Sequence, residues 1–266
     1  MYENRVTAFI DILGFRNIIS KSIGNTDFTK KIYEVLNSMK ADSISDELFI
    51  DVAPNIPEEE MEDVSKIAKL FSKAVKSQSS VQVTHFSDSI VLSIGLDNDM
   101  NVMSVLEYIG RLMYRLWNEF NILIRGAITI GELVHLENGA LFGPAMVKAY
   151  DLETNLANYP RIIIDDYTSK CILTSPHYKN MTNLFIDFSA AITRNGREYT
   201  VAKGLEINLK TVLDHLINSH FIFNNAKKIE VENTIRDAIT NLEQLKSETE
   251  KIDVQEKYNY LINFFS

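Results

Sequence analysis

Two aspartates carry the clearest chemical signal in the sequence, because each follows a run of strand-like, largely apolar residues. Asp11 lies near the end of VTAFIDI (residues 6–12), and Asp88 lies between the two β-rich arms of SVQVTHFSDSIVLSI (residues 80–94). Two carboxylates at neighbouring strand ends repel each other, and a divalent cation such as Mg²⁺ or Mn²⁺ removes that cost. The pattern therefore indicates a two-metal site for phosphoryl transfer, while simple capping of a turn or helix by each aspartate is the alternative.

The segments that must position these aspartates are a mixture of strands and helices. Strand patterns cover residues 6–12, 122–130, 161–164, 184–188 and 198–201, and hairpin patterns cover 80–94 and 133–142. Helical patterns cover residues 28–39, 64–75, 100–120 and 144–155, with an acidic inserted loop at 41–62. This order predicts an α+β fold built on an antiparallel sheet flanked by helices. We expect one domain over residues 1–205 and a helical extension over 206–266, packed on that domain or at a dimer interface.

Composition excludes several classes of function. The net charge of −9 disfavours binding to nucleic acid, whose phosphates an acidic surface repels. The single cysteine, Cys171, excludes an internal disulfide and a cysteine metal cluster. The sequence contains no signal peptide and no apolar run of the roughly 20 residues that cross a bilayer, so we expect a cytoplasmic protein with no membrane partner.

Four segments together resemble the motifs of class III nucleotidyl cyclases, in the order of that family. They are FIDILGF (9–15), FSDS (86–89), RGAITIG (125–131) and GPAMVKAYDLE (143–153). The resemblance spans residues 6–165 and implies the ferredoxin-like catalytic domain of those enzymes. It also implies a homodimer, in which two domains meet head to tail and each supplies part of each site.

The resemblance assigns a role to each residue around the two aspartates. Asp11 and Asp88 would hold two Mn²⁺ or Mg²⁺ ions, with the carbonyl of Ile12 as a further ligand. The backbone N–H groups at the start of the following helix would receive the triphosphate, namely those of Leu13, Gly14 and Phe15. The ribose 3′-oxygen would attack the α-phosphorus and pyrophosphate would leave, which makes the implied enzyme a phosphorus–oxygen lyase.

The sequence departs from the family at two positions of the fourth motif. Val147 stands where the family has an Asn that orients the ribose, and Asp151 stands where it has an Arg that stabilises the transition state. Another cation must then replace the Arg, or the domain is inactive. The candidates are Arg125, Lys148, Arg161, Arg194 and Arg197. We take Arg125 as the catalytic candidate, with a structural ion pair at the start of its strand as the alternative.

The positions that read the base also differ from those of purine cyclases. Thr84 and Ala140 replace the charged or polar residues that recognise adenine or guanine. A threonine hydroxyl can hydrogen-bond a smaller base, and the chain resembles the pyrimidine cyclases of bacterial Pycsar anti-phage systems. That likeness implies a UTP or CTP substrate, with UTP favoured, and a separate effector that binds the cyclic nucleotide. His135 and Glu137, two residues apart, match a metal pair only weakly, and we do not assign them to the site.

Three other functions fit parts of the sequence. A cyclase fold with a disabled site would bind nucleotide without turning it over, as Val147 and Asp151 suggest. A polymerase or dinucleotide cyclase would use a related sheet, but such enzymes carry a Gly-Gly-Asp hairpin where this chain has Ser87-Asp88-Ser89. A scaffold without a ligand would leave Asp11 unexplained.

Overall fold

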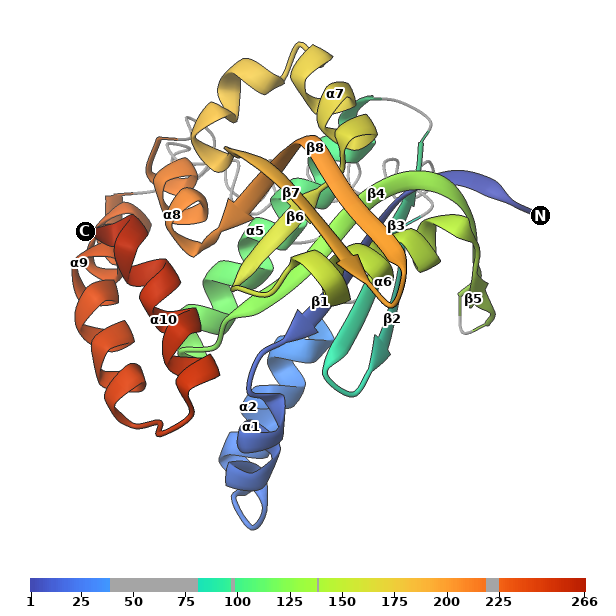
Figure 1. Cartoon of the computed structure of the whole chain (residues 1–266). Helices are drawn as coiled ribbons and strands as arrows, with labels where there is room; N and C mark the ends of the chain where they lie inside the picture. The colour runs from blue at the N-terminus through green and yellow to red at the C-terminus, as the bar shows by residue number, and fades with distance from the viewer. Residues whose placement is uncertain (39–80, 97–98, 138, 219–224) are drawn as a thin grey trace, which may run out of the picture.

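A sheet of eight strands forms the centre of the protein (Figure 1). The computed structural model describes residues 1–38, 81–96, 99–137, 139–218 and 225–266. The strand order is β2-β3-β1-β4-β6-β8-β7, and β5 pairs with β4 beside this ladder. All of these pairings are antiparallel except that of β4 with β6. The strands are β1 (Glu3–Ile12), β2 (Gln82–Phe86), β3 (Ser89–Gly95), β4 (Ile124–His135), β5 (Leu141–Phe142), β6 (Arg161–Ile164), β7 (Ile186–Arg194) and β8 (Arg197–Asn208).

The helices form where the sequence offers apolar residues at helical spacing together with suitable ends. Asp165 caps α7 by accepting a hydrogen bond from the Thr168 N–H at 2.8 Å. Gly143 precedes α6 with φ of 150°, and a Cβ at that position would lie 2.7 Å from the Glu132 carbonyl oxygen, so only glycine fits there. The α-helices are α1 (Phe15–Ser22), α2 (Thr26–Ser38), α5 (Asp99–Phe120), α6 (Pro144–Leu156), α7 (Asp166–Thr174), α8 (Leu209–Asn218), α9 (Asn225–Ser247) and α10 (Ile252–Phe265).

The two faces of the sheet differ because side chains alternate along each strand. In β1 the even-numbered residues from Val6 to Ile10 join the main hydrophobic core, which also contains the buried face of α5. The odd-numbered residues, Asp11 among them, lie on the other face, where Phe9 packs against Ala149 of α6. Figure 1 shows α6 in front of the sheet and α5 behind it. The polar residues of the predicted site therefore belong to the α6 side.

The C-terminal helices pack on the end of the sheet. The ring of Tyr260 in α10 stacks on Tyr159, with 4.8 Å between the ring centroids, and its hydroxyl donates to the buried carboxylate of Glu206 in β8. Arg161 of β6 lies between these groups, with its guanidinium 5.6 Å from the Tyr260 ring centre and 3.1 Å from a Glu206 carboxylate oxygen. These contacts connect α10 directly to two strands.

The observed fold confirms the predicted α+β class, with a largely antiparallel sheet, flanking helices and helices at the C-terminus. The hairpin around Asp88, the helix at 100–120 and the helix after Gly143 all form. The strands predicted at 184–188 and 198–201 are longer in the structure, as the nine-residue β7 and the twelve-residue β8. They extend beyond the predicted ends because the two strands pair with each other as far as Arg194 and Arg197. Strand β8 also continues to Asn208, past the predicted start of the helical extension. The predicted loop at 41–62 and helix at 64–75 lie outside the described residues.

Candidate active site

The register of the sheet brings the two predicted aspartates to one corner. Asp11 of β1 pairs with Ser89 of β3, the residue that follows Asp88 in the hairpin turn. The backbone N–H of Ile12 donates to the carbonyl oxygen of Asp88 at 2.8 Å. The ends of these two strands are therefore directly adjacent, and both aspartate side chains are half-buried.

Arg125 of β4 lies on the other side of Asp11 and pairs with it. Its Nε–H donates to a carboxylate oxygen of Asp11 at 2.9 Å, and the same nitrogen lies 2.9 Å from a carboxylate oxygen of Glu153 in α6. The Nε–H bond points to Asp11. The Glu153 carboxylate is therefore attracted by the positive charge of Arg125 but accepts no hydrogen bond from this nitrogen. The predicted alternative for Arg125, an ion pair, is thus present in the structure. Its predicted catalytic role stays a prediction.

Glu153 is the site residue that the sequence did not single out. Its side chain is buried, and burial raises the pKa of its carboxyl, opposed by Arg125 and by a hydrogen bond from the Thr154 hydroxyl, while Asp11 raises it further. A charged residue at helical spacing from apolar ones is the signal that could have revealed it, because Ala149, Leu152 and Leu156 lie around Glu153 on the buried face of α6.

The carboxylate groups at this corner are of the chemical type that binds a divalent cation. Asp11, Asp88 and Glu153, when ionised, outweigh the single positive charge of Arg125, and carboxylate oxygens are the ligands that Mg²⁺ and Mn²⁺ prefer. Within the part of the chain that the structure describes, no group of three or more His, Cys, Asp or Glu side chains is arranged to hold a metal ion. A metal here would therefore take Asp11 and Asp88, the Ile12 carbonyl, and oxygens from water or phosphate.

The start of α1 lies directly after Ile12 and carries the residues expected to receive a triphosphate. Gly14 precedes the helix in the left-handed conformation, with φ of 76°, and no side chain caps the first turn. The N–H of Leu13 donates to the Leu123 carbonyl at 2.9 Å, so it is already used by the fold. This narrows the predicted phosphate donors in the backbone to Gly14 and Phe15.

Thr84, the predicted base reader, is hydrogen-bonded to a buried histidine. Its hydroxyl lies 2.8 Å from Nε2 of His135 in β4, and His135 Nδ1 lies 2.8 Å from the hydroxyl of Ser93 in β3. His135 pairs with Leu141 at the β4–β5 hairpin, so Thr84 lies next to the hairpin that carries Ala140, the second predicted base position. Both ring nitrogens of His135 therefore contact hydroxyl groups, so neither is directed at a metal ion shared with Glu137.

The stability of the protein should depend on pH through His135. Burial, and then the charge of Arg5, lower the pKa of His135 to about 4 from the ordinary 6.5. The unfolded chain binds a proton between these values and the folded chain does not, so the stabilisation is complete above pH 6.5 and is lost as the pH falls toward 4. We expect His135 to account for a fall of about 2 kcal/mol in the free energy of unfolding between pH 7.5 and pH 5.

Urea denaturation of the wild type and of His135→Gln at both pH values measures this contribution. The difference between the two proteins isolates His135 from Glu153, whose raised pKa acts in the opposite direction over part of the range. Equal pH dependence in the two proteins would show that His135 is not held neutral by the fold.

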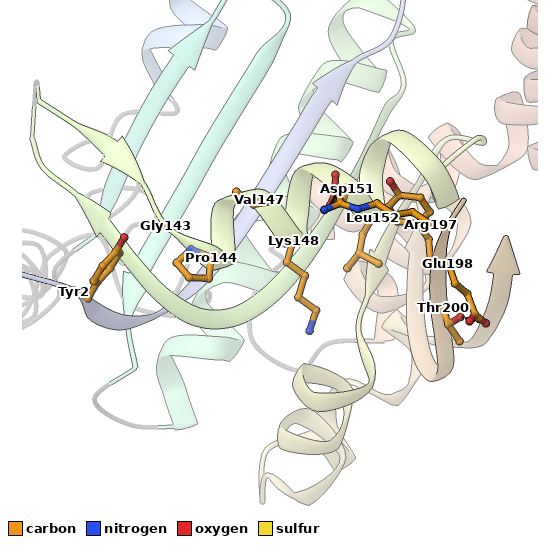
Figure 2. Close-up of a pocket in the computed structure, with 11 residues that line it drawn as sticks. Tyr2, Gly143, Pro144, Val147, Lys148, Asp151, Leu152, Arg197, Glu198 and Thr200 are labelled. Atoms are coloured by element: carbon orange, nitrogen blue, oxygen red, sulfur yellow. Dashed lines mark hydrogen bonds and ion pairs between the residues drawn. The ribbon is translucent and has the colours of Figure 1, made fainter. Parts of the chain in front are cut away.

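A cavity of about 700 Å³ opens along the outer side of α6, between that helix and the β7–β8 hairpin (Figure 2). Val147 and Asp151, the two departures from the family motif, both line it. Asp151 faces Arg197 of β8 across one end of the cavity, at 3.9 Å between charged atoms, and Tyr2 lies at the other end.

The five candidate cations have different environments. Arg161 is enclosed by aromatic rings and Glu206, and the Lys148 amine lies 2.5 Å from the buried carboxylate of Asp165. Arg125 forms ion pairs with Asp11 and Glu153. Arg194 is exposed on β7 opposite Arg197, and Arg197 is 74% exposed and lines the cavity.

Comparisons with known proteins find similar chains only among solved structures. No model of a protein family matches the chain, and no curated protein matches it. Among solved structures, the chain is similar to the adenylyl cyclase CyaB from P. aeruginosa, with a TM-score of 0.47 and 15% identity over 78% of this chain and 94% of that one. It is also similar to the catalytic core of a rhodopsin-guanylyl cyclase with converted specificity, solved with ATPαS, with a TM-score of 0.47 and 14% identity over 78% and 96% of the two chains.

A third similar structure is an adenylate/guanylate cyclase/hydrolase from Silicibacter pomeroyi, with a TM-score of 0.43 and 15% identity over 78% of this chain and 98% of that one. Because these scores are below 0.5 and the identities below 25%, the function proposed below rests on the residues of this chain. Among the described helices, none has both the length and the apolar character needed to span a bilayer.

Proposed function

We propose that this protein is a metal-dependent nucleotidyl cyclase that converts a pyrimidine nucleoside triphosphate, UTP in preference to CTP, into its 3′,5′-cyclic monophosphate and pyrophosphate. The observation that carries the proposal is the adjacency of the Asp11 and Asp88 strand ends, joined by the hydrogen bond from Ile12 to Asp88. This corner has an excess of negative charge beside the uncapped start of α1, which is the arrangement that a metal-bound triphosphate requires.

Each residue of the proposed site has a separate role in the proposed reaction. Asp11, Asp88 and the Ile12 carbonyl would hold Mn²⁺ or Mg²⁺, which when bound supplies the charge that favours ionisation of the ribose 3′-hydroxyl. Gly14 and Phe15 would donate their N–H groups to phosphate oxygens. Arg125 would hold Asp11 in position, since its Nε–H donates to that carboxylate.

The bond changes are those of an intramolecular phosphoryl transfer. The 3′-oxygen forms a bond to the α-phosphorus, the bond from that phosphorus to the bridging oxygen of pyrophosphate breaks, and the hydroxyl proton leaves to solvent. Positioning and charge stabilisation supply most of the acceleration of such a step. Arg197, exposed at the cavity beside Asp151, is a candidate for the cation that replaces the family's transition-state Arg.

We also propose that the protein acts as a homodimer through the α6 side of the sheet. Large apolar side chains are exposed there, on the β5 strand, on α6 and at the N-terminus, and such clusters mark association surfaces. They are Tyr2, Phe142, Val147 and Tyr150. The proposed role of the cyclic nucleotide, as a messenger to a separate effector in anti-phage defence, rests on the sequence resemblance.

Product analysis tests the proposed function directly. We expect purified protein with Mn²⁺ to form cyclic UMP from UTP, and little or no cyclic product from ATP or GTP, when each nucleotide is supplied separately and products are read by mass spectrometry. A cyclic purine product would retain the cyclase and reject the assignment of Thr84 and Ala140. Nucleotide binding without any product, at concentrations where the protein is dimeric, would favour the disabled nucleotide-binding module.

A further inference from the structure

One nitrogen of Arg125 lies at the same distance from two carboxylates that come from different elements. Nε is 2.9 Å from Oδ2 of Asp11, near the end of β1, and 2.9 Å from Oε1 of Glu153 in α6. This nitrogen carries a single hydrogen, which points to Asp11. Asp11 and Glu153 therefore compete for one N–H group, and in the structure Asp11 receives it.

Glu153 has one carboxylate oxygen that accepts no hydrogen bond. Its side chain is 4% exposed, and Oε2 accepts from the Thr154 hydroxyl at 3.0 Å. Oε1 is buried and has no hydrogen-bond partner among the described residues. A buried carboxylate oxygen without a donor is unfavourable, so Oε1 would gain from the Nε–H that now points to Asp11.

The guanidinium of Arg125 is placed to change acceptor with little movement. Its Nη1–H donates to the carbonyl oxygen of Ala157 at 3.5 Å, at the end of α6. Glu153 lies one helical turn before Ala157, so both groups belong to the last turn of the same helix. Because Nε is already 2.9 Å from both carboxylates, only the direction of the N–H has to change.

A divalent cation at Asp11 would alter the competition between the two carboxylates. The cation and the guanidinium are both positive, so each reduces the attraction of the Asp11 carboxylate for the other. The charges decide this outcome, because a carboxylate has enough lone pairs to contact both groups. Glu153 offers the N–H a charged acceptor at an equal distance, and this acceptor is not one of the proposed metal ligands.

We propose that Glu153 is a positioning residue that accepts the Arg125 N–H when Mn²⁺ or Mg²⁺ binds Asp11, and thereby raises the affinity of the site for the cation. Arg125 then pairs with Asp11 when no cation is bound and with Glu153 when the cation is bound. Glu153 acts through Arg125 and contacts neither the metal nor the substrate. The inference rests on the proposed function, since Asp11 is a metal ligand only if this corner is a metal site.

The first test measures Mn²⁺ binding without nucleotide, from the electron paramagnetic resonance signal of free Mn²⁺, in the wild type and in Glu153→Gln. Glutamine keeps the shape of the side chain and removes its charge. We expect Kd for Mn²⁺ to rise about tenfold, the value of one hydrogen bond to a charged group. The melting temperature in EDTA should not fall, because burial makes the charged form of Glu153 unfavourable in the fold. A lower melting temperature with an unchanged Kd would assign Glu153 a purely structural role and overturn the inference.

Two further variants separate the contact from the charge. Glu206→Gln is the matched control, because Glu206 is also buried and accepts from an arginine, Arg161, but lies on β8, which β4 and β6 separate from β1. It should lower the melting temperature and leave Kd for Mn²⁺ unchanged. Glu153→Asp keeps the charge but shortens the side chain by one methylene, so it should weaken Mn²⁺ binding nearly as much as Glu153→Gln. Wild-type affinity in Glu153→Asp would overturn the inference.

A crystal structure of the wild type with Mn²⁺ addresses the contact itself, and it decides the question even if the variants fail to fold. The guanidinium of Arg125 should be turned so that its Nε–H points to Oε1 of Glu153. An Nε–H that still points to Asp11, with Mn²⁺ bound to that carboxylate, would overturn the inference.

The outcomes distinguish this inference from the proposed function. Mn²⁺ bound at Asp11 with the same Kd in the wild type and in Glu153→Gln overturns the inference and leaves the proposed metal site in place. No binding of Mn²⁺ at Asp11 in the wild type, even with UTP present, overturns the proposed metal-dependent function and the inference together.

Discussion

Replacing Asp11 by Asn is expected to reduce nucleotide turnover by about a thousandfold, without lowering the melting temperature. The change removes a negative charge from the corner where Mn²⁺ or Mg²⁺ would bind. Arg125 keeps a partner, because its Nε also lies 2.9 Å from Glu153. The fold therefore loses little, and the relief of repulsion between Asp11 and the neighbouring carboxylates can raise stability. Steady-state kinetics with Mn²⁺ and UTP, paired with thermal denaturation, measure both effects.

Asp88→Asn should give the same result, and Asp187→Asn is the matched control. Asp187 is an exposed aspartate on strand β7, far from Asp11 in the order of the sheet. Its replacement should change neither turnover nor melting temperature. Strong destabilisation by Asp11→Asn or Asp88→Asn, with no change in metal dependence, would assign these residues to turn or helix capping.

Replacing Arg161 by Ala is expected to lower the free energy of unfolding by about 3–5 kcal/mol, the cost of leaving a buried charge unpaired. The guanidinium is 3.1 Å from the buried carboxylate of Glu206 and donates to the Leu156 carbonyl at 3.0 Å. It also lies 4.6 Å from the ring centre of Phe188 and 5.6 Å from that of Tyr260. Its loss would weaken β6, β8 and α10 together, because all three meet at this side chain.

Urea denaturation of Arg161→Ala, Arg161→Lys and Arg16→Ala tests this expectation. Lysine keeps the charge but lacks the planar group that stacks on rings, so it should recover only part of the loss. Arg16 is exposed on α1, and its replacement should change the free energy of unfolding by less than about 0.5 kcal/mol. A loss below about 1 kcal/mol in Arg161→Ala would show that Glu206 is not dependent on this cation.

The expected result also removes Arg161 from the candidate catalytic cations. A guanidinium enclosed by Glu206 and aromatic rings has no freedom to meet a substrate phosphate. The sequence could not make this distinction, because the partners of Arg161 are far from it along the chain: Glu206 is 45 residues away, and Tyr260 is in the last helix. Only the pairing of β6 with β8 and the packing of α10 bring them together.

The sequence predicts an element correctly where the conformation of a segment depends mainly on its own residues. The alternation in β1, the turn at Ser87-Asp88, the glycine before α6 and the long apolar stripe of α5 can all be read from neighbouring residues, because strand and helix periods are local properties. Helix α7 escaped prediction, since nine residues of mixed composition carry a weak period and its capping residue, Asp165, reads equally well as the end of a strand.

By itself the sequence determined the α+β class and the positions of Asp11 and Asp88 at strand ends. Its resemblance to the class III cyclases made Thr84 a candidate for base recognition, which stays a prediction. The tertiary structure alone decided which groups those residues meet. Arg125 and Glu153 come to Asp11 from β4 and α6, and His135 comes to Thr84 across the sheet. The reason is physical: hydrogen bonds and ion pairs form between atoms about 3 Å apart, and strand register and helix packing, which depend on the whole chain, set those distances.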